Sequence, residues 1–537
     1  MNITSRDVQT RGKNTYSFDE FLEKRSDLDW YKDDPFLQKA LKKYADLQYE
    51  QIHKELLDFS PAVSSKWNTL AERAARPEVR PYMLHFDAFN HRIDRVVRPM
   101  ETHQLEKEVF GAGLFSSQMT SWESFAKRML IHQLGEAGVA CPLTCTIGLI
   151  ALLEQYPNED IPELEQILQH TKEGLDGDFA IGAQFMTEIQ GGSDLPANVL
   201  EAVSEGKNYR LYGNKFFCSV AHADYSVVTA KISGTDKVST FIVPSWLPGD
   251  KEKEVRNGYE INRIKWKMGT AELPTGEFQY NGALAYPVGP AGKGVAVAVG
   301  IVLTLSRLEI GIACAGFMLR AAREASLYGD FRSVFGKKVK DYPLSARTLK
   351  KIENTAQRTA AGAFKIYDLF LRLNQPLNAG IPVDQPLEQR KQLFNLRELV
   401  LLQKICATYE GAEVLRDAIS VFAGHGVMEE FSSLPRIFRD VAVNEQWEGP
   451  RNLLLTQIYR DIQRVANWYP PADFVANVLE GASQETIAGF SEQLTDLLQR
   501  PVCGEVSEAS MEAAEEWDVF CDSFFKAYQT IALEELQ

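Results

Sequence analysis

The amino-acid sequence predicts an α+β fold in which a β domain lies between two helical domains. Two observations support this prediction. Helical periodicity dominates residues 1–172 and 291–468, and short β-branched and aromatic runs fill residues 173–290 between them. A final segment, residues 469–537, is acidic and is expected to form a helical extension. The 537 residues are enough for these four units.

The N-terminal region, residues 1–172, is predicted to be a helical domain. Residues 35–59 place apolar side chains at positions i, i+3, i+4 and i+7, which forms one apolar face of a helix. Residues 122–156 continue this pattern and are rich in small side chains, as in GEAGVACPLT (135–144). Small residues let helices approach closely, and they also leave room for a ligand, so both interpretations stay open.

The central region is predicted to be a compact antiparallel β barrel or sandwich. Its expected strands include YRLYGNKFFCSV (209–220), YSVVTAKIS (225–233), STFIVPSW (239–246) and TGEFQYNGAL (275–284). These segments are alternating or β-branched, and Gly, Asn, Asp and Pro separate them.

Three long amphipathic segments, residues 301–329, 345–374 and 386–422, predict a C-terminal four-helix bundle. Residues 376–386, PLNAGIPVDQP, are expected to form a loop because proline and glycine mark them.

The charge distribution argues against nucleic acid as a partner. The formal net charge is −15, and residues 466–537 contain 14 acidic and 2 basic side chains, so most of the excess lies in the extension. Such a surface repels phosphate backbones. We therefore expect that DNA is not a partner.

Other patterns argue against secretion, metal binding and membrane insertion. Seven scattered cysteines, an odd number without a CxxC pair, suit a reducing compartment, and we expect a cytoplasmic protein. The eight histidines show no metal-ligand spacing, so no metal site is expected. No signal peptide is recognisable, and no uninterrupted apolar run approaches the ~20 residues that span a bilayer.

Two motifs in the predicted β domain could line a ligand. MTEIQGGSD (186–194) has two adjacent glycines, which let a ligand approach the backbone, and hydroxyl groups at Thr187 and Ser193. NKFFCSVAHAD (214–224) sets two aromatic rings beside Ser219, which suits a flat heteroaromatic ligand. The first motif can also be an ordinary Gly-Ser turn, and the second can be strand core.

Two motifs in the predicted bundle have similar alternatives. FRSVFGKK (331–338) combines Arg332, which could bind a pyrophosphate, with Phe335, which could cover an adenine. The same residues could simply end a helix with Gly336 as its cap. FAGHGV (422–427) is a glycine loop, and we expect His425 within it to be a loop residue rather than a catalytic base.

Glu448 is the candidate catalytic base. It stands between Trp447 and Gly449 in RIFRDVAVNEQWEGPRN (436–452), which also holds an Arg439–Asp440 pair. A carboxylate against an indole ring is partly desolvated, which raises its pKa and makes it a better base near neutral pH. The alternative is a surface glutamate at a helix start.

Together these five motifs resemble, in order and spacing, those of the acyl-CoA dehydrogenase superfamily. The matches are a TEpGaGSD-like segment, a KxxITN-like strand, an RxxFGK helix end, a GGxG loop and an R-D…WEG segment, over roughly residues 120–465. The forms MTE-QGGSD, K-FF-S and EAG--CPLT look most like the AidB-like branch. The resemblance implies the domain order given above, FAD as cofactor, and a homo-oligomer, dimer or tetramer, with shared FAD sites.

The resemblance also implies particular cofactor-binding residues. These are Met186, Thr187, Gly192, Ser193, Phe217, Ser219, Arg332, Phe335, Gly424 and Asn452. Met186, Thr187, Phe217 and Ser219 would line the flavin, and Gly192 and Ser193 would lie near the cofactor or CoA. Arg332, Phe335 and Gly424 would contact the pyrophosphate and adenine side of a neighbouring subunit's FAD.

Catalytic roles are implied in the same way. Glu448 matches the family's usual catalytic glutamate, and Arg307 would support the active-site loop electrostatically. The position used for the base in other members, just before Arg307, holds Ser306 here. Glu448 would remove the α-proton of a long or bulky acyl-CoA while flavin N5 accepts a hydride from the β-carbon. Electrons would pass to a flavoprotein or another acceptor.

Three positions depart from the family pattern: Pro450, Ser420 and Tyr342–Pro343 replace residues that are plausible FAD contacts. Weaker FAD binding and slower reaction with ordinary β-oxidation substrates are therefore expected. Two rival functions follow from the resemblance. One is an AidB-like protective protein that binds nucleic acid or an acyl ligand with little turnover. The other is an acyl-CoA oxidase.

Overall fold

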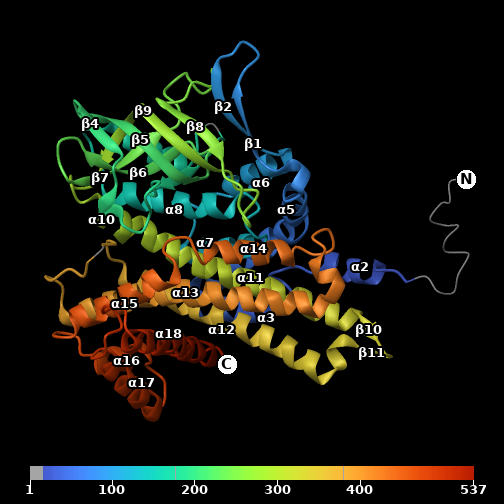
Figure 1. Cartoon of the computed structure of the whole chain (residues 1–537). Coiled ribbons are helices and arrows are strands. Elements are labelled where there is room, and N and C mark those ends of the chain that lie inside the picture. The colour runs from blue at the N-terminus through green and yellow to red at the C-terminus, as the bar shows by residue number, and fades with distance from the viewer. Residues whose placement is uncertain (1–15, 176, 379) are drawn as a thin grey trace, which may run out of the picture.

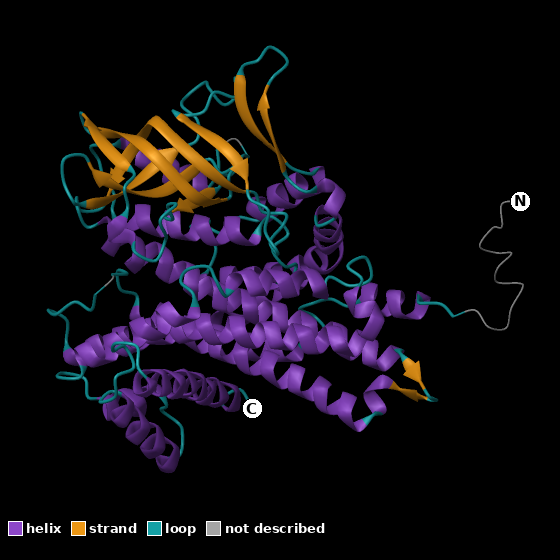
Figure 2. Ribbon diagram, in the orientation of Figure 1, coloured by secondary structure: helices purple, strands orange, loops and turns teal. Residues whose placement is uncertain are grey.

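The structure is a computed structural model that describes residues 16–175, 177–378 and 380–537. A β domain lies at one end, a layer of N-terminal helices lies beneath it, and long C-terminal helices follow (Figures 1 and 2). A group of C-terminal helices packs at the lower edge of the bundle in Figure 1. This arrangement confirms the predicted fold class of two helical regions around a β domain.

The N-terminal part contains the helices α2 (Asp19–Asp27), α3 (Pro35–Ala45), α4 (Tyr49–Pro61), α5 (Asn68–Ala74), α6 (Met100–Gly111), α7 (Ser121–His132), α8 (Ala140–Gln155) and α9 (Pro162–Lys172). Several begin with residues that favour helix starts. Asp34 caps α3 and Thr120 caps α7 by accepting a backbone N–H, and α3 and α9 begin with proline.

A projecting hairpin, β1 (Tyr82–Phe86) and β2 (Arg92–Val97), interrupts the N-terminal helices. Helical periodicity did not predict it. Its base is fixed by the buried Asp94, which accepts hydrogen bonds from the backbone N–H of Ile261 (2.9 Å) and from Arg92 (3.0 Å), and whose Oδ1 lies 2.6 Å from His85 Nδ1. The alternation of exposed and half-buried residues along β1 is the period-2 signal that helical windows obscured.

The β domain is formed by β3 (Gly182–Phe185), β4 (Glu201–Glu205), β5 (Asn208–Ser219), β6 (Tyr225–Ile232), β7 (Val238–Pro244), β8 (Tyr259–Ile264) and β9 (Thr275–Val288). Pairing runs β6–β4–β5–β9–β7 and returns to β6, so five strands close into a barrel. Two pairings, β3–β6 and β4–β6, are parallel, which corrects the expectation of a purely antiparallel sheet. Long connections separate both pairs in sequence, as parallel strands require.

The C-terminal part contains α10 (Gly294–Val297), α11 (Thr304–Phe331), α12 (Pro343–Leu373), α13 (Leu387–Phe422), α14 (Leu434–Asn444) and α15 (Arg451–Val465). A short hairpin, β10 (Ser333–Val334) and β11 (Lys337–Lys338), joins α11 to α12. It lies at the opposite end of the molecule from the β domain (Figure 1).

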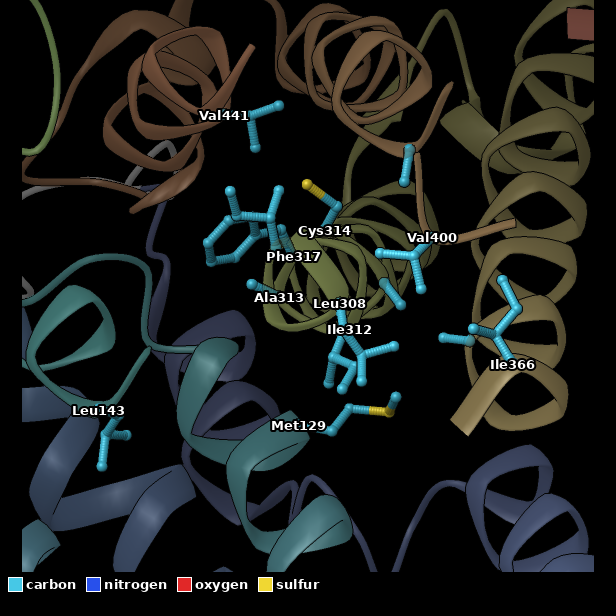
Figure 3. Close-up of a cluster of buried hydrophobic side chains, with 14 of the residues drawn as sticks. Met129, Leu143, Leu308, Ile312, Ala313, Cys314, Phe317, Ile366, Val400 and Val441 are labelled. Carbon is cyan, nitrogen blue, oxygen red and sulfur yellow. The ribbon is translucent and has the colours of Figure 1, made fainter. Parts of the chain in front are cut away.

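Helix α11 is the centre of the molecule. Side chains from α7, α8, α12, α13 and α14 surround it; Figure 3 labels Met129, Leu143, Ile366, Val400 and Val441 around Leu308, Ile312, Ala313, Cys314 and Phe317. The continuous helical segment Gly294–Phe331 is long and apolar enough to cross a membrane, with a mean hydropathy of 1.9 in its most apolar window. That window is 72% buried by other parts of the chain, as in the core helix of a folded domain.

The extension consists of α16 (Pro471–Val478), α17 (Gln484–Leu497) and α18 (Glu508–Glu534). Helix α18 packs on α12 and α13 through an apolar face that includes Trp517, whose Nε1 donates to the Leu455 carbonyl at 3.0 Å. Some of its acidic side chains meet cations of the bundle: Asp522 pairs with Arg451 at 2.7 Å and Glu535 with Lys365 at 2.6 Å. The acidic segment is thus a packed part of the fold.

Candidate active site

Glu448 lies in the loop between α14 and α15, where it meets strand β3 and helix α11. Its Oε1 accepts a hydrogen bond from Nε2 of Gln184 at 2.6 Å, and Gln184 also donates to Ser306 Oγ at 3.1 Å. The backbone of Glu448 has φ +55°, a conformation that is uncommon for a residue with a side chain. Strained backbone of this kind persists only where its surroundings hold it in place.

Two buried cations hold this loop by its carbonyl groups. Arg307 Nε donates to the carbonyl of Glu448 at 2.9 Å. Lys404 Nζ donates to the carbonyls of Glu445 at 2.8 Å and Gly449 at 2.7 Å. Burial lowers the pKa of Arg307 to about 10 and that of Lys404 to about 8. The loop therefore has three fixed carbonyls: that of the strained residue itself, one before it and one after it.

The carboxyl group of Glu448 faces a narrow cavity between α8, α11 and the α14–α15 loop. Trp447, Ser306, Gln184 and Cys141 are among the residues that line it. Burial raises the pKa of Glu448, while the charges of Arg307 and Lys404 and the hydrogen bond from Gln184 lower it in part. The result is a carboxyl group that takes up a proton more readily than an exposed glutamate does.

The β domain brings three of the flavin-lining candidates together. The backbone N–H of Phe216 donates to the carbonyl of Thr187 at 2.9 Å, so Thr187 lies beside the residue that precedes Phe217, and Ser219 follows on the same strand. Phe217 is 48% exposed, although Lys265 Nζ lies 4.4 Å from its ring centroid. An exposed aromatic ring beside two hydroxyl groups suits a flat ligand.

A series of side-chain contacts links the flavin-lining candidates Thr187, Phe217 and Ser219, here called the cofactor wall, to the Glu448 loop. Ser219 Oγ lies 3.1 Å from Thr275 Oγ1, and Thr275 accepts a hydrogen bond from Lys267 Nζ at 2.9 Å. Lys267 Nζ in turn lies 5.7 Å from the ring centroid of Trp447, the neighbour of Glu448. The candidate cofactor wall and the candidate base thus belong to one region.

The remaining β-domain candidates have partly structural surroundings. Met186 is buried in a core cluster, and its carbonyl accepts a hydrogen bond from Lys215 at 3.0 Å. Gly192 packs against Thr187, because a Cβ atom there would lie 2.3 Å from Thr187 Oγ1. Ser193 is exposed next to it. The intervening Glu188 forms a buried ion pair with Lys215 at 2.8 Å.

Arg332, Phe335 and Gly424 lie at the other end of the molecule. Phe335 is at the tip of the β10–β11 hairpin and is 98% exposed. The guanidinium of Arg332 lies 5.1 Å from the ring centroid of Tyr16. Gly424 is exposed, and its neighbour His425 accepts or donates a 2.8 Å hydrogen bond with Tyr328. These three residues do not join the Glu448 site within one chain.

The last candidate and two of the family departures lie at helix starts, whereas Ser420 lies in the last turn of α13. Asn452 is exposed in the first turn of α15, directly after Pro450 and Arg451. Pro450 precedes α15 and Pro343 begins α12, positions where proline is favoured because its missing N–H is not needed. Arg439 and Asp440 do not pair with each other: Arg439 binds Glu429, and Asp440 accepts backbone N–H groups of Thr270 and Glu136.

Gln184, Lys404 and Lys267 were not recognised from the sequence. Gln184 lies in a strand two residues before the glycine motif, and Lys404 lies inside a helix with no motif around it. For Gln184 and Lys404, the available signal in the sequence was a polar residue on the otherwise apolar, buried face of a strand or helix. Within the part of the chain that the structure describes, no group of three or more His, Cys, Asp or Glu side chains could hold a metal ion.

Family models match the chain in three consecutive segments. The adaptive response protein AidB N-terminal domain matches residues 22–171, the acyl-CoA dehydrogenase middle domain matches residues 183–283, and the acyl-CoA dehydrogenase C-terminal domain matches residues 292–463. These segments cover the N-terminal helices, the barrel and the bundle that build the site.

Two relatives agree with these matches. Acyl-CoA dehydrogenase family member 11 of Caenorhabditis elegans is 30% identical over 451 residues, which are 80% of this chain and 70% of the relative. Putative acyl-CoA dehydrogenase AidB of Escherichia coli is 27% identical over 72% of this chain and 70% of its own length.

Solved structures share the whole architecture. ACDH-11 of C. elegans in complex with C11-CoA has a TM-score of 0.77 at 25% identity and covers 99% of this chain and 94% of its own. The apo form of Bd2924 has a TM-score of 0.81 at 25% identity, with 95% and 98% covered. An acyl-CoA dehydrogenase of Bacillus anthracis complexed with FAD shares the fold, with a TM-score of 0.57 at 18% identity over 81% of this chain and 83% of its own.

The fold and the family matches therefore define a FAD-dependent oxidoreductase of the acyl-CoA dehydrogenase class. The chain belongs to the acyl-CoA dehydrogenase family, and its N-terminal domain is that of the AidB-like branch. The family and branch predicted from the sequence are both confirmed.

Proposed function

We propose that the protein is a FAD-dependent acyl-CoA dehydrogenase in which Glu448 removes the α-proton of the bound thioester. The observation that carries this proposal is the setting of Glu448. Its carboxyl faces a cavity, burial raises its pKa, and Gln184, Arg307 and Lys404 hold the side chain and the loop that presents it. A base positioned in this way satisfies both the geometry and the proton affinity that the reaction needs.

We propose that Thr187, Phe217 and Ser219 hold the flavin against the Trp447–Glu448 loop. Their fit rests on the exposed Phe217 ring, the hydroxyl groups beside it and the Thr275–Lys267–Trp447 contacts that join the β domain to the base. Met186, Gly192 and Ser193 complete this wall, and Asn452 is a further cofactor contact. Bound FAD supplies the acceptor for the β-hydride.

The remaining cofactor contacts are proposed to act between subunits of a homo-oligomer. Phe335 and Gly424 are exposed, Arg332 is half-buried, and all three lie away from the Glu448 site, where they could contact the FAD of a second copy. A phenylalanine that is almost fully exposed at a hairpin tip supports such a role, because an oligomer would bury it.

A long or bulky acyl group is proposed as the substrate. The complex of ACDH-11 with C11-CoA supports a long chain. A second cavity of about 550 Å³, lined by residues of α7, α8, α11 and α12, lies close to the Glu448 cavity. The ion pair between Arg128 and Glu309, together with the His132–Glu309 hydrogen bond, lies between the two cavities, since Arg128 lines one and His132 the other.

An anaerobic titration with acyl-CoA thioesters tests this function. Flavin absorbance near 450 nm should bleach with at least one chain-length class, and Glu448→Gln should abolish bleaching without preventing thioester binding. A flavin that no thioester bleaches, or a Glu448→Gln variant with full activity, would rule the proposal out.

An AidB-like role with little turnover is the alternative, and the AidB N-terminal domain match favours it. Binding of nucleic acid is disfavoured, because the extension carries 14 acidic against 2 basic residues over 466–537.

An acyl-CoA oxidase would differ from a dehydrogenase by forming peroxide rapidly in air. We place the reaction in fatty-acid metabolism, with an electron-accepting flavoprotein as partner, and the seven free cysteines support a reducing compartment such as the cytoplasm.

A further inference from the structure

The cavity that Glu448 lines also contains polar side chains that proton abstraction does not use. Glu448, Gln184 and Ser306 line it, and so do Glu136, Asn444 and His132, which come from other elements. Glu136 belongs to the loop before α8, Asn444 ends α14, and His132 ends α7. All three are more than nine-tenths buried, with relative exposures of 4%, 7% and 1%.

Each of these side chains has hydrogen-bonding capacity that the described residues leave unfilled. Glu136 accepts one bond through Oε1, from the backbone N–H of Cys141 at 3.3 Å, and its Oε2 has none. The amide of Asn444 forms no hydrogen bond with any described residue. His132 uses Nε2 on Glu309 at 2.7 Å, and its buried Nδ1 has no partner. Buried polar groups are usually paired, so this concentration in one cavity points to a ligand that pairs with them.

The Glu136 carboxyl is placed to act as a donor as well as an acceptor. It belongs to a buried cluster that also contains Asp440, Glu272, Lys267 and Arg436. Three carboxyl groups share two cations there, and burial raises the pKa of both Glu136 and Glu272. Two backbone N–H groups already bind Asp440. A protonated Glu136 can donate a hydrogen bond to an oxygen atom in the cavity.

We propose that the acyl group of the substrate carries an oxygen function, a hydroxyl or a carbonyl, beyond its β-carbon, and that Glu136 and Asn444 hydrogen-bond it. This inference rests on the proposed acyl-CoA dehydrogenase function and names its substrate class. A plain hydrocarbon chain would leave the three polar groups desolvated and unpaired. Sites built to pair with a substrate hydroxyl discriminate strongly against analogues that lack it.

The test compares straight-chain alkanoyl-CoA thioesters with hydroxyalkanoyl-CoA thioesters of equal chain length, with the hydroxyl placed from the γ-carbon outward. Two quantities are measured: the rate constant for anaerobic bleaching of the FAD-loaded protein, and the equilibrium dissociation constant by calorimetry. We expect the best hydroxyacyl thioester to exceed its alkanoyl counterpart at least about tenfold in both. Equal or better values for alkanoyl thioesters would overturn the inference.

Three variants separate recognition from folding. Asn444→Leu and Glu136→Leu should each bring the hydroxyacyl preference towards unity, whereas Glu136→Gln, which keeps a donor and an acceptor, should retain most of it. Asn395→Leu is the control, because Asn395 is a buried asparagine that bonds Tyr469 outside the cavity. It should lower the melting temperature and leave the preference unchanged.

The outcomes distinguish this inference from the proposed function. If no thioester bleaches the flavin, the dehydrogenase function fails, while the dissociation constants still decide whether the cavity prefers an oxygenated chain. If alkanoyl thioesters bleach rapidly and Asn444→Leu has no effect on the preference, the function stands and the inference fails. Ordered water would then be what satisfies the three side chains.

Discussion

Two regions of this molecule carry family motifs. In one region the residues of a single chain assemble a site, whereas in the other the motif residues have few contacts within the chain. At the junction of the β domain and the bundle, Glu448 is held by residues from β3, α11 and α13, and a chain of side chains reaches Ser219. At the far end, Phe335 and Gly424 are exposed, and among the described residues no neighbouring atom lies within 4 Å of a Cβ placed at Gly424. The contacts within one chain support a role for a motif that acts in that chain. A motif that acts on a neighbouring subunit appears in the single chain only as a set of exposed residues.

Glu448→Gln should produce the largest effect, because it removes the proposed base at the completed end. We expect the bleaching rate constant to fall roughly 10²–10⁴-fold, while acyl-CoA binding is kept. Stopped-flow absorbance near 450 nm measures the rate, and calorimetry measures binding. A fall of less than about fivefold would assign proton abstraction to another group.

The pH dependence provides a second readout of the same substitution. Since burial raises the pKa of Glu448, the wild-type rate should rise with pH through a value above that of a free glutamate. Because the pKa of Glu448 is raised in the folded state, its protonation favours folding; this contribution is present below the unfolded pKa and is lost as pH rises through the folded pKa. The free energy of unfolding of the wild type should therefore fall, relative to that of Glu448→Gln, as pH rises.

Phe335→Ala tests the end of the molecule that holds Phe335 and Gly424. The ring is 98% exposed, so its removal should change the free energy of unfolding of an isolated chain by less than about 0.5 kcal/mol. If it covers a neighbouring subunit's FAD, the dissociation constant for FAD should rise about tenfold, a loss of about 1.4 kcal/mol. Val506→Ala is the matched control, since Val506 is 89% exposed in the extension. Unchanged FAD affinity in Phe335→Ala would show that this ring does not contribute to a FAD site shared between subunits.

The sequence predicts residues that belong to local motifs, and it does not predict residues that reach the site only through long-range contacts. Glu448 and Arg307 belong to motifs with fixed spacing, so both are identifiable from the sequence. Gln184 and Lys404 reach the same loop from 264 and 45 residues away, and neither stands in a motif. The fold class was predictable because period changes mark each domain. The β1–β2 hairpin and the parallel β3–β6 pairing were not, since both depend on long-range contacts such as those of Asp94 with Ile261.

A pair of glycine substitutions compares the two regions directly. Gly192→Ala would bring a Cβ to 2.3 Å from Thr187 Oγ1, and we expect a loss of about 1–3 kcal/mol in unfolding free energy together with lower FAD content. Gly424→Ala meets no atom within 4 Å, so stability should stay within about 0.5 kcal/mol of wild type. Thermal unfolding of both apoproteins decides this point. A Gly424→Ala protein as unstable as Gly192→Ala would show that the far-end glycine is structural.

Gln184→Leu should have a small and specific effect on the reaction rate. The hydrogen bond from Gln184 lowers the pKa of Glu448, so its loss should raise that pKa. The acid limb of the bleaching rate should shift to higher pH, with little change at high pH where Glu448 is ionised in both proteins. Ser306→Ala is the control, because Ser306 contacts Gln184 and not the Glu448 carboxyl, and it should shift the limb less. An equal loss of rate at every pH would instead mean that Gln184 orients the base without tuning its proton affinity, which would leave burial and the two cations to set the pKa of Glu448.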